Sequence, residues 1–166
     1  MKYKEYNITQ EQINQINKIV DEKFVYNSKS INYGDYNKAR LSNFVGKSAE
    51  YFFQLIYPDS IKVDNYDYDF IYQGKKFDIK CKMQASLPKE HWTFDIPAYQ
   101  VNNQKNEVYQ LFILLNSLTK IYDFGTITKE DFIKKSKFFA KGTLVEENGY
   151  RYRIDTYSIK ISDLWN

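Results

Sequence analysis

The sequence predicts an α/β fold, on the border of α+β, in which helices flank a mixed β-sheet. Two early stretches place apolar residues at helical spacing, and several later stretches show the alternation or the β-branched and aromatic content of strands. Short polar loops separate these strands. This order favours helices packed on a sheet over an all-helical or an all-β architecture.

The first helix is predicted over about residues 10 to 24, because Thr9 and Gln12 fit a capping box and apolar residues continue at helical spacing. A second helix is predicted over about residues 35 to 57, and Pro58 ends it. The apolar face of this second helix consists of Leu41, Phe44, Val45, Ala49, Phe52, Phe53 and Ile56.

The strands follow the helices. A β-hairpin is predicted within residues 61 to 84, where Tyr66 to Tyr72 alternate, Gly74 lies in the turn, and KKFDIKCKMQ alternates again. A short helix begins at the N-cap Thr128 and ends in a lysine-rich stretch. The remaining predicted strands are Trp92 to Ile96, Val108 to Leu115, Lys120 to Ile127, a hairpin of Leu144 to Glu147 with Tyr150 to Ile154 around Asn148-Gly149, and Ile159 to Ile161.

The length of 166 residues matches the usual size of one domain, so we expect a single domain over residues 1-166. Apolar residues make up 43% and charged residues 27% of the chain, as in ordinary soluble globular proteins. The N-terminal stretch MKYKEYNITQ lacks the apolar segment of a signal peptide, and the longest apolar run, Leu111 to Leu115, is too short to span a bilayer. We therefore expect a cytoplasmic, intracellular protein with no membrane partner.

The inventory of metal-binding residues is small. The chain has one cysteine, Cys81, and one histidine, His91, which excludes an internal disulfide and is a poor set for a structural zinc site. Any metal would need carboxylates. The net charge of +3 permits a nucleic-acid partner without establishing one. The abundance of Lys, Asn, Ile and Tyr, all encoded by A/T-heavy codons, suggests a bacterial or phage source.

The predicted hairpin gathers acidic side chains beside a lysine. If Gln73 and Gly74 are the two turn residues, Asp69 faces Asp78 with Cβ atoms roughly 5 Å apart, and Asp67 faces Lys80. Two like charges so placed destabilise the fold unless something such as a divalent cation compensates them. A three-residue loop would instead turn the two aspartates to opposite faces.

Such a patch suits phosphodiester hydrolysis. Carboxylate oxygens suit Mg²⁺, which usually takes one or two of them, retains waters and bridges to phosphate; Mn²⁺ is an alternative. The metal would activate a water and neutralise charge on the phosphate, while Lys80 would orient that water or stabilise the developing charge.

This pattern resembles the PD-(D/E)xK nuclease superfamily, in which a helix bears a glutamate, an aspartate follows, and (D/E)-x-K lies on the next strand. The corresponding pieces, within about residues 41 to 84, are Gly46-Lys47-Ser48-Ala49-Glu50, Asp69 in YDYDFIYQGKK, and Asp78-Ile79-Lys80. The resemblance implies a restriction-endonuclease-like core and products with 5′-phosphate. It also implies that Asp69, Asp78 and the backbone carbonyl of Ile79 hold the metal, that Glu50 supports a metal or water, and that Lys80 serves the nucleophile.

Two alternatives stay open within this pattern. A literal Pro-Asp occurs at Pro58-Asp59, so Asp59 is the second candidate for the first aspartate; Asp69 is preferred because a paired strand fixes it beside Asp78, although Tyr68 stands where the family has proline. Glu50 lies off the centre of the apolar face of its helix, and an ordinary solvated glutamate is its alternative interpretation.

The candidate nucleic-acid contacts are basic or amide side chains. Gln84 shares the strand face of Asp78 and is a candidate for contact with phosphate or water. The lysine-rich stretch from Lys134 to Lys141 is either a solvated face or a DNA-backbone contact. The residues assigned to nucleic-acid binding are Lys76, Lys82, Gln84, Lys134 and Lys135.

Together these features predict a Mg²⁺-dependent deoxyribonuclease, an endonuclease rather than an exonuclease, whose partner is DNA and which could act as a homodimer. Two alternatives from other classes are a catalytically inactive nucleic-acid-binding module and a phage or mobile-element protein that binds a host protein through its aromatic surface.

Overall fold

The centre of the fold is a six-stranded mixed sheet. The computed structural model describes residues 2–27 and 35–165. The strand order is β1-β7-β6-β4-β3-β2, in which β4 and β6 are parallel and all other neighbours are antiparallel. The strands are β1 (Lys4–Asn7), β2 (Ile61–Lys62), β3 (Phe70–Tyr72), β4 (Lys75–Gln84), β6 (Val108–Leu115) and β7 (Lys120–Thr128).

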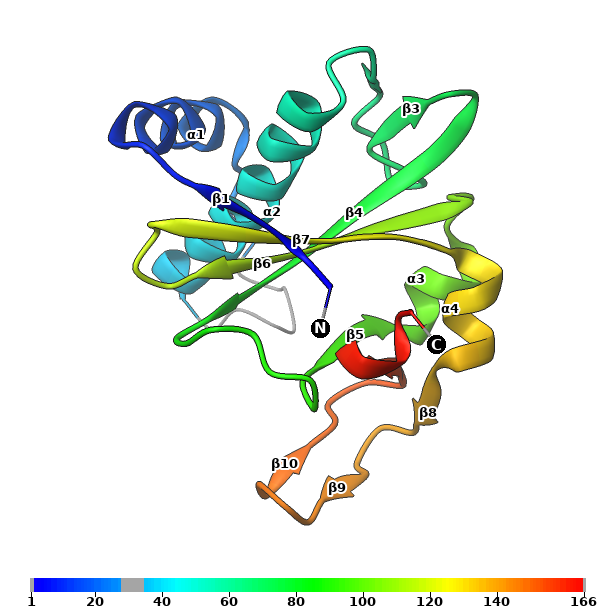
Figure 1. Ribbon diagram of the computed structural model, residues 1–166. Coiled ribbons are helices and arrows are strands. Elements are labelled where there is room, and N and C mark those ends of the chain that lie inside the picture. Colours follow the sequence, from blue (N-terminus) through cyan, green and yellow to red (C-terminus); the bar gives the residue numbers. More distant parts are fainter. Residues whose placement is uncertain (1, 28–34, 166) are drawn as a thin grey trace.

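Helices α1 (Gln10–Lys23) and α2 (Tyr36–Ile56) cover one face of this sheet (Figure 1). The capping box of Thr9 and Gln12 is present at the start of α1, and Asp35 caps α2. Their apolar residues form one core with alternate residues of β4, among them Phe77 and Ile79. Both helices are therefore confirmed close to their predicted bounds.

A second layer covers the other face of the sheet and encloses a second core around Tyr109, Tyr122 and Phe132 (Figure 1). Thr128 caps the first turn of its longer helix, as predicted. The layer consists of α3 (Ala98–Asn103), α4 (Lys129–Lys135), a three-stranded antiparallel sheet of β5 (Thr93–Pro97), β11 (Thr156–Lys160) and β8 (Lys137–Phe139), the hairpin β9 (Leu144–Val145) and β10 (Tyr150–Arg151), and the 3₁₀ helix η1 (Ile161–Asp163).

The architecture is a mixed α/β fold, which confirms the predicted fold class at that level. The predicted strand from Tyr66 is wrong over its first four residues, because β3 begins only at Phe70. Tyr150 pairs with Val145, so four residues rather than two separate β9 from β10. Five short elements, β1, β2, α3, β8 and η1, were not predicted, because two to six residues hold too little periodicity.

In the described ranges, no helix is both long and apolar enough to cross a membrane.

Candidate functional site

The turn between β3 and β4 has the predicted length. Tyr72 pairs with Lys75 and Phe70 with Phe77, so Gln73 and Gly74 are the two turn residues. Both have positive φ angles, 49° for Gln73 and 74° for Gly74, as a type I′ hairpin turn requires. The premise on which the acidic patch was predicted is therefore confirmed.

At the end of the β3–β4 ladder, the side chain of Asp69 makes a hydrogen bond that a backbone carbonyl would otherwise make. Its backbone N–H donates to the carbonyl of Phe77 at 2.8 Å, and its carboxylate Oδ2 accepts the backbone N–H of Ile79 at 2.8 Å. In an unbroken ladder the carbonyl of Tyr68 would accept that Ile79 N–H. The carboxylate takes the place of the carbonyl, which fastens Asp69 to the residue between Asp78 and Lys80.

The segment before Asp69 is not a strand. The backbone N–H groups of Asp67 and Tyr68 donate to the side chain of Asn65, which holds these residues in a turn. The carboxylate of Asp67 lies 3.7 Å from the ammonium of Lys105. The prediction that Asp67 faces Lys80 is wrong, because the hairpin pairing stops at Phe70.

Asp78 and Lys80 form a close pair on β4. Asp78 is only 5% exposed, and the Lys80 ammonium lies 2.8 Å from its Oδ2 atom. The same ammonium donates to the side-chain oxygen of Gln100 on α3 at 2.8 Å. Lys80 is thus held between a carboxylate and an amide. We call Asp69, Asp78 and Lys80 the Asp–Lys cluster.

With both carboxyl groups ionised, the Asp–Lys cluster would carry more negative than positive charge. Burial, followed by repulsion from Asp78 and then from Glu50, raises the pKa of Asp69 well above its usual range. The N–H of Ile79 and the ammonium of Lys80 act in the opposite direction and are outweighed. The half-buried Asp69 and the buried Asp78 therefore share one ammonium, and a proton or a cation is needed to balance the second charge.

Polar groups from the neighbouring elements border the cluster. Tyr109 is the β6 partner of Asp78, and burial raises the pKa of its hydroxyl, with Asp78 adding to the rise. Lys129, at the start of α4, donates to the carbonyl of Gln104 at 2.5 Å. Burial lowers the pKa of Lys129 while the charges of Asp78 and Asp67 oppose this change, so its ammonium also lies within electrostatic reach of the cluster.

Glu50 on α2 lies in an ion-pair network of its own. It is only 9% exposed, so the interpretation as a solvated glutamate is wrong. Lys47 contacts both of its carboxylate oxygens, at 3.0 and 2.9 Å, and Lys62 contacts one of them at 3.0 Å. Lys47 also lies 3.4 Å from Asp64, which pairs with Lys23 at 3.2 Å. We call these five residues the α2 network.

The two candidates for the first aspartate occupy different surroundings. Asp59 is exposed in the turn that follows α2. Asp69 is hydrogen-bonded to β4, and the negative charge of Asp78 raises its pKa. The geometry therefore favours Asp69 as the partner of Asp78.

Of the predicted contact residues on β4, none lies in the Asp–Lys cluster itself. The ammonium of Lys76 lies over the ring of Tyr68, 5.5 Å from its centroid. Lys82 donates to the carbonyl of Thr93 and lies over the ring of Trp92. Gln84 ends the strand, six residues beyond Asp78 and so about 20 Å away along it.

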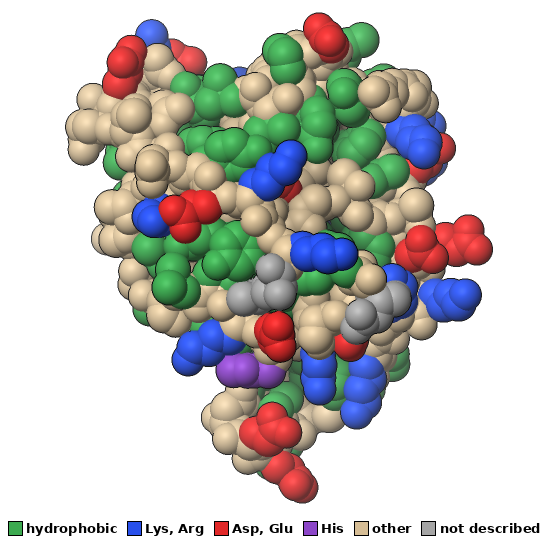
Figure 2. Space-filling view, in the orientation of Figure 1, with side chains coloured by type: hydrophobic (Ala, Val, Ile, Leu, Met, Phe, Trp, Pro, Cys, Tyr) green, Lys and Arg blue, Asp and Glu red, His purple; other side chains and the backbone are tan. Residues whose placement is uncertain are grey.

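Lys134 and Lys135 lie in the last turn of α4. Lys134 is exposed, whereas Lys135 is half-buried and lines a cleft. Figure 2 shows basic and acidic side chains interspersed on this face, with several basic ones gathered over the layer that contains α4 and β8.

Sequence reasoning missed Gln100. It lies on a six-residue helix that follows Pro97, and nothing in a single isolated glutamine marks it before the fold is known. Its contact with Lys80 depends on how α3 packs beside β4, across 20 residues of chain. The lysine itself was predicted, but the group that orients it was not.

The donor chemistry of the cluster fits a hard divalent cation. Two carboxylates and the backbone carbonyl of Ile79 are oxygen donors of the kind that Mg²⁺ takes together with waters. Within residues 2–27 and 35–165, however, no group of three or more His, Cys, Asp or Glu side chains is arranged to hold a metal ion. Any ion here would thus depend on two carboxylates rather than a full protein cage.

Comparison of the sequence with protein-family models and with curated proteins gave no match.

Proposed function

We propose that the protein is a metal-dependent nuclease that hydrolyses DNA phosphodiester bonds at the Asp–Lys cluster. The observation that supports this function best is the hydrogen bond from the Ile79 N–H to Asp69, because it fixes one carboxylate beside Asp78 and Lys80. Two like charges held together inside a fold repel each other, and a bound cation or a proton relieves this repulsion. The order of Glu50, Asp69 and Asp78-Ile79-Lys80 adds the resemblance to PD-(D/E)xK nucleases.

Asp69, Asp78 and the carbonyl of Ile79 would hold Mg²⁺ or Mn²⁺ in this proposal. When bound, the ion supplies charge stabilisation for the phosphate and a water of lowered pKa. Lys80 stabilises negative charge on the phosphate or orients the attacking water, because its ammonium is fixed beside Asp78. Gln100 is a positioning residue that keeps this ammonium in place.

The test is incubation of the purified protein with supercoiled and linear DNA in Mg²⁺, Mn²⁺ or EDTA. We expect cutting only with metal. Asp78→Asn preserves the shape of the side chain but removes its charge, and should lower the rate on the order of 10²–10³-fold, as loss of a major charge-stabilising group does. Asp59→Asn is the matched control, since Asp59 is an exposed aspartate in a nearby turn.

The outcomes separate the two aspartates as well as the two functions. Loss of cutting in Asp59→Asn with Asp69→Asn unaffected would assign the first aspartate to Asp59. A folded wild-type protein that cuts no DNA in either metal would contradict the nuclease proposal.

One observation favours a second candidate, a catalytically inactive nucleic-acid-binding module. The carboxylate of Glu50 is already engaged by Lys47 and Lys62, and Asp78 already contacts Lys80, so neither requires a metal to be partnered. This candidate predicts DNA binding that weakens with salt but is indifferent to EDTA and to Asp78→Asn.

A further inference from the structure

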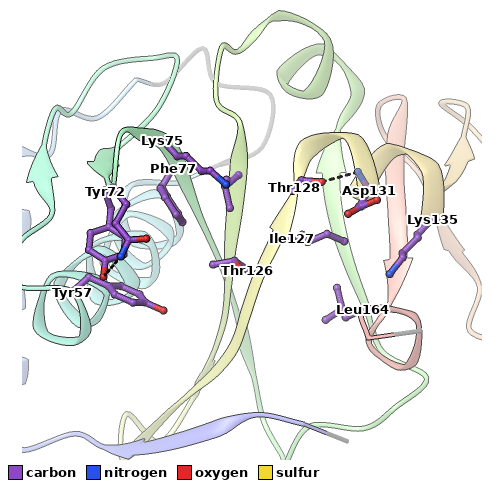
Figure 3. A pocket seen from close by; sticks show the side chains of 12 residues that line it. Tyr57, Tyr72, Lys75, Phe77, Thr126, Ile127, Thr128, Asp131, Lys135 and Leu164 are labelled. Atoms are coloured by element: carbon purple, nitrogen blue, oxygen red, sulfur yellow. Dashed lines mark hydrogen bonds between the residues drawn. The ribbon is translucent and has the colours of Figure 1, made fainter.

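A cleft of about 400 Å³ lies at the end of the central sheet, between the β3–β4 turn and α4 (Figure 3). Its volume falls within the range of small-molecule sites, about 300–1,000 Å³. Phe77 lines it, whereas the next residue, Asp78, projects to the opposite face of β4. The cleft is thus separate from the Asp–Lys cluster, although β4 contributes to both.

The charged residues of the cleft favour an anion. Lys75 reaches into it from the start of β4, and Lys135 reaches into it from the end of α4 on the other side (Figure 3). Asp131 is the single acid among the described lining residues. No ion pair joins Lys75 or Lys135 to an acid in the part of the chain that the structure describes. Two lysines without ionic partners, on opposite walls, give the cleft positive charge that suits an anionic ligand.

The aromatic residues of the cleft favour a planar ring. Tyr57 and Tyr72 form one wall, with ring centroids 4.8 Å apart (Figure 3). Both are only half-buried, so part of each ring remains accessible. Tyrosine rings bind nucleobases by stacking, with little preference for the base. Phe77 and Val108 are apolar residues that also line the cleft.

We propose that this cleft binds one nucleotide unit, with its phosphate attracted by the positive charge of Lys75 and Lys135 and its base against Tyr57 and Tyr72. The proposal goes beyond the nuclease function, because it requires neither a metal nor cutting. It names a ligand that is both anionic and aromatic, since the cleft presents both kinds of surface.

Isothermal titration calorimetry in EDTA tests the ligand class with three probes: dTMP, thymidine and inorganic phosphate. We expect dTMP to bind more tightly than either part alone. Lys75→Gln combined with Lys135→Gln should weaken dTMP binding on the order of tenfold or more. Lys18→Gln combined with Lys89→Gln removes the same charge from exposed lysines outside the cleft and should leave the affinity unchanged.

Photo-crosslinking tests the location. A single-stranded oligonucleotide carrying 5-iodouracil, irradiated with the protein in EDTA, should yield crosslinks to Tyr57 or Tyr72 by mass spectrometry. Tyr72→Leu keeps apolar contact with Tyr57 and Phe77 but removes a ring, and should reduce the preference for dTMP over phosphate.

Three results would overturn the proposal: equal affinity for phosphate and dTMP, unchanged dTMP affinity in the Lys75→Gln/Lys135→Gln variant, or crosslinks that map elsewhere. Because every arm is run in EDTA, these results are independent of DNA cutting. A protein that binds dTMP in the cleft but cuts nothing would retain this inference and lose the nuclease proposal.

Discussion

Two neighbouring groups of charged side chains differ in how they are balanced. The Asp–Lys cluster sets two carboxylates, Asp69 and Asp78, against the single ammonium of Lys80. The α2 network sets its two carboxylates, Glu50 and Asp64, against three lysines. The pKa directions follow this difference. Burial raises the pKa of Asp69, and neighbouring acids raise it further, whereas the lysines around Asp64 outweigh burial and lower its pKa.

The difference separates a self-sufficient network from a cluster that requires another positive charge. In the α2 network each carboxylate has at least two ammonium partners. These ion pairs hold α2 beside the 61–69 segment, and this structural role accounts for the network without a metal. In the Asp–Lys cluster the second carboxylate is balanced only by a proton or a cation. The carboxylate that the resemblance assigns to metal support, Glu50, therefore lies in the network that needs no metal.

The largest expected effect is a loss of DNA cutting when the charge of Asp69 in the Asp–Lys cluster is removed. Asp69→Asn keeps an oxygen that accepts the Ile79 N–H but removes the charge. We expect DNA cutting to fall on the order of 10³-fold, about 4 kcal/mol in transition-state stabilisation. The free energy of unfolding in EDTA should not fall, because the repulsion with Asp78 disappears. Urea denaturation measures this; a marked loss of stability would show that the charge itself holds the fold.

The next effect concerns metal binding. Mg²⁺ or Mn²⁺ should stabilise the wild-type protein, by about 2.7 kcal/mol when the ion is present at 100 times its Kd. Thermal unfolding with and without metal measures the shift, which should vanish in Asp78→Asn. Glu50→Gln should retain most of it if the α2 network is separate from the metal site. Loss of the shift in Glu50→Gln would place Glu50 among the ligands, as the family resemblance implies.

Glu50→Gln should itself cost stability. The amide cannot balance Lys47 and Lys62, whose contacts with Glu50 lie among the more buried ion pairs of the chain. We expect the free energy of unfolding to fall by about 1–3 kcal/mol. Glu22→Gln, at an exposed position of α1, is the control and should change little. Equal stability of the two variants would contradict the structural role of the α2 network.

The sequence predicts the Asp–Lys cluster because the information is local. Asp69, Asp78 and Lys80 lie within 12 residues of each other, and one two-residue turn brings Asp69 beside β4. Strand alternation then places the acid and the lysine on one face of β4. The partners of this cluster come from elsewhere in the chain. Gln100 and Lys129 approach only through the packing of α3 and α4, which no local pattern encodes.

The α2 network shows the complementary limit. The helical wheel places Glu50 off the apolar face, which is correct for the isolated helix. Lys62 and Asp64 cover that side of α2, and they arrive from the loop and short strand after it. A two-residue strand such as β2 has no periodicity to detect, so the burial of Glu50 could not be predicted from its own helix.

The smallest expected effect is on how the free energy of unfolding depends on pH, which differs between the α2 network and the Asp–Lys cluster. The pKa of Asp64 is lowered in the fold: burial would raise it, but the lysines of the α2 network prevail. Its charged form therefore stabilises the fold above its usual pKa of 3.8, and this contribution is lost as the pH falls below that value. The raised pKa of Asp69 has the opposite sign, so protonation there relieves repulsion.

Asp64→Asn should consequently flatten the loss of stability below about pH 4. We expect less than about 1 kcal/mol, because the Asp64 side chain is 38% exposed and screened by solvent. Urea denaturation at pH 3 and pH 6, with Asp59→Asn as control, measures the difference; identical profiles for the two variants would mean that the α2 network adds no pH-dependent stability.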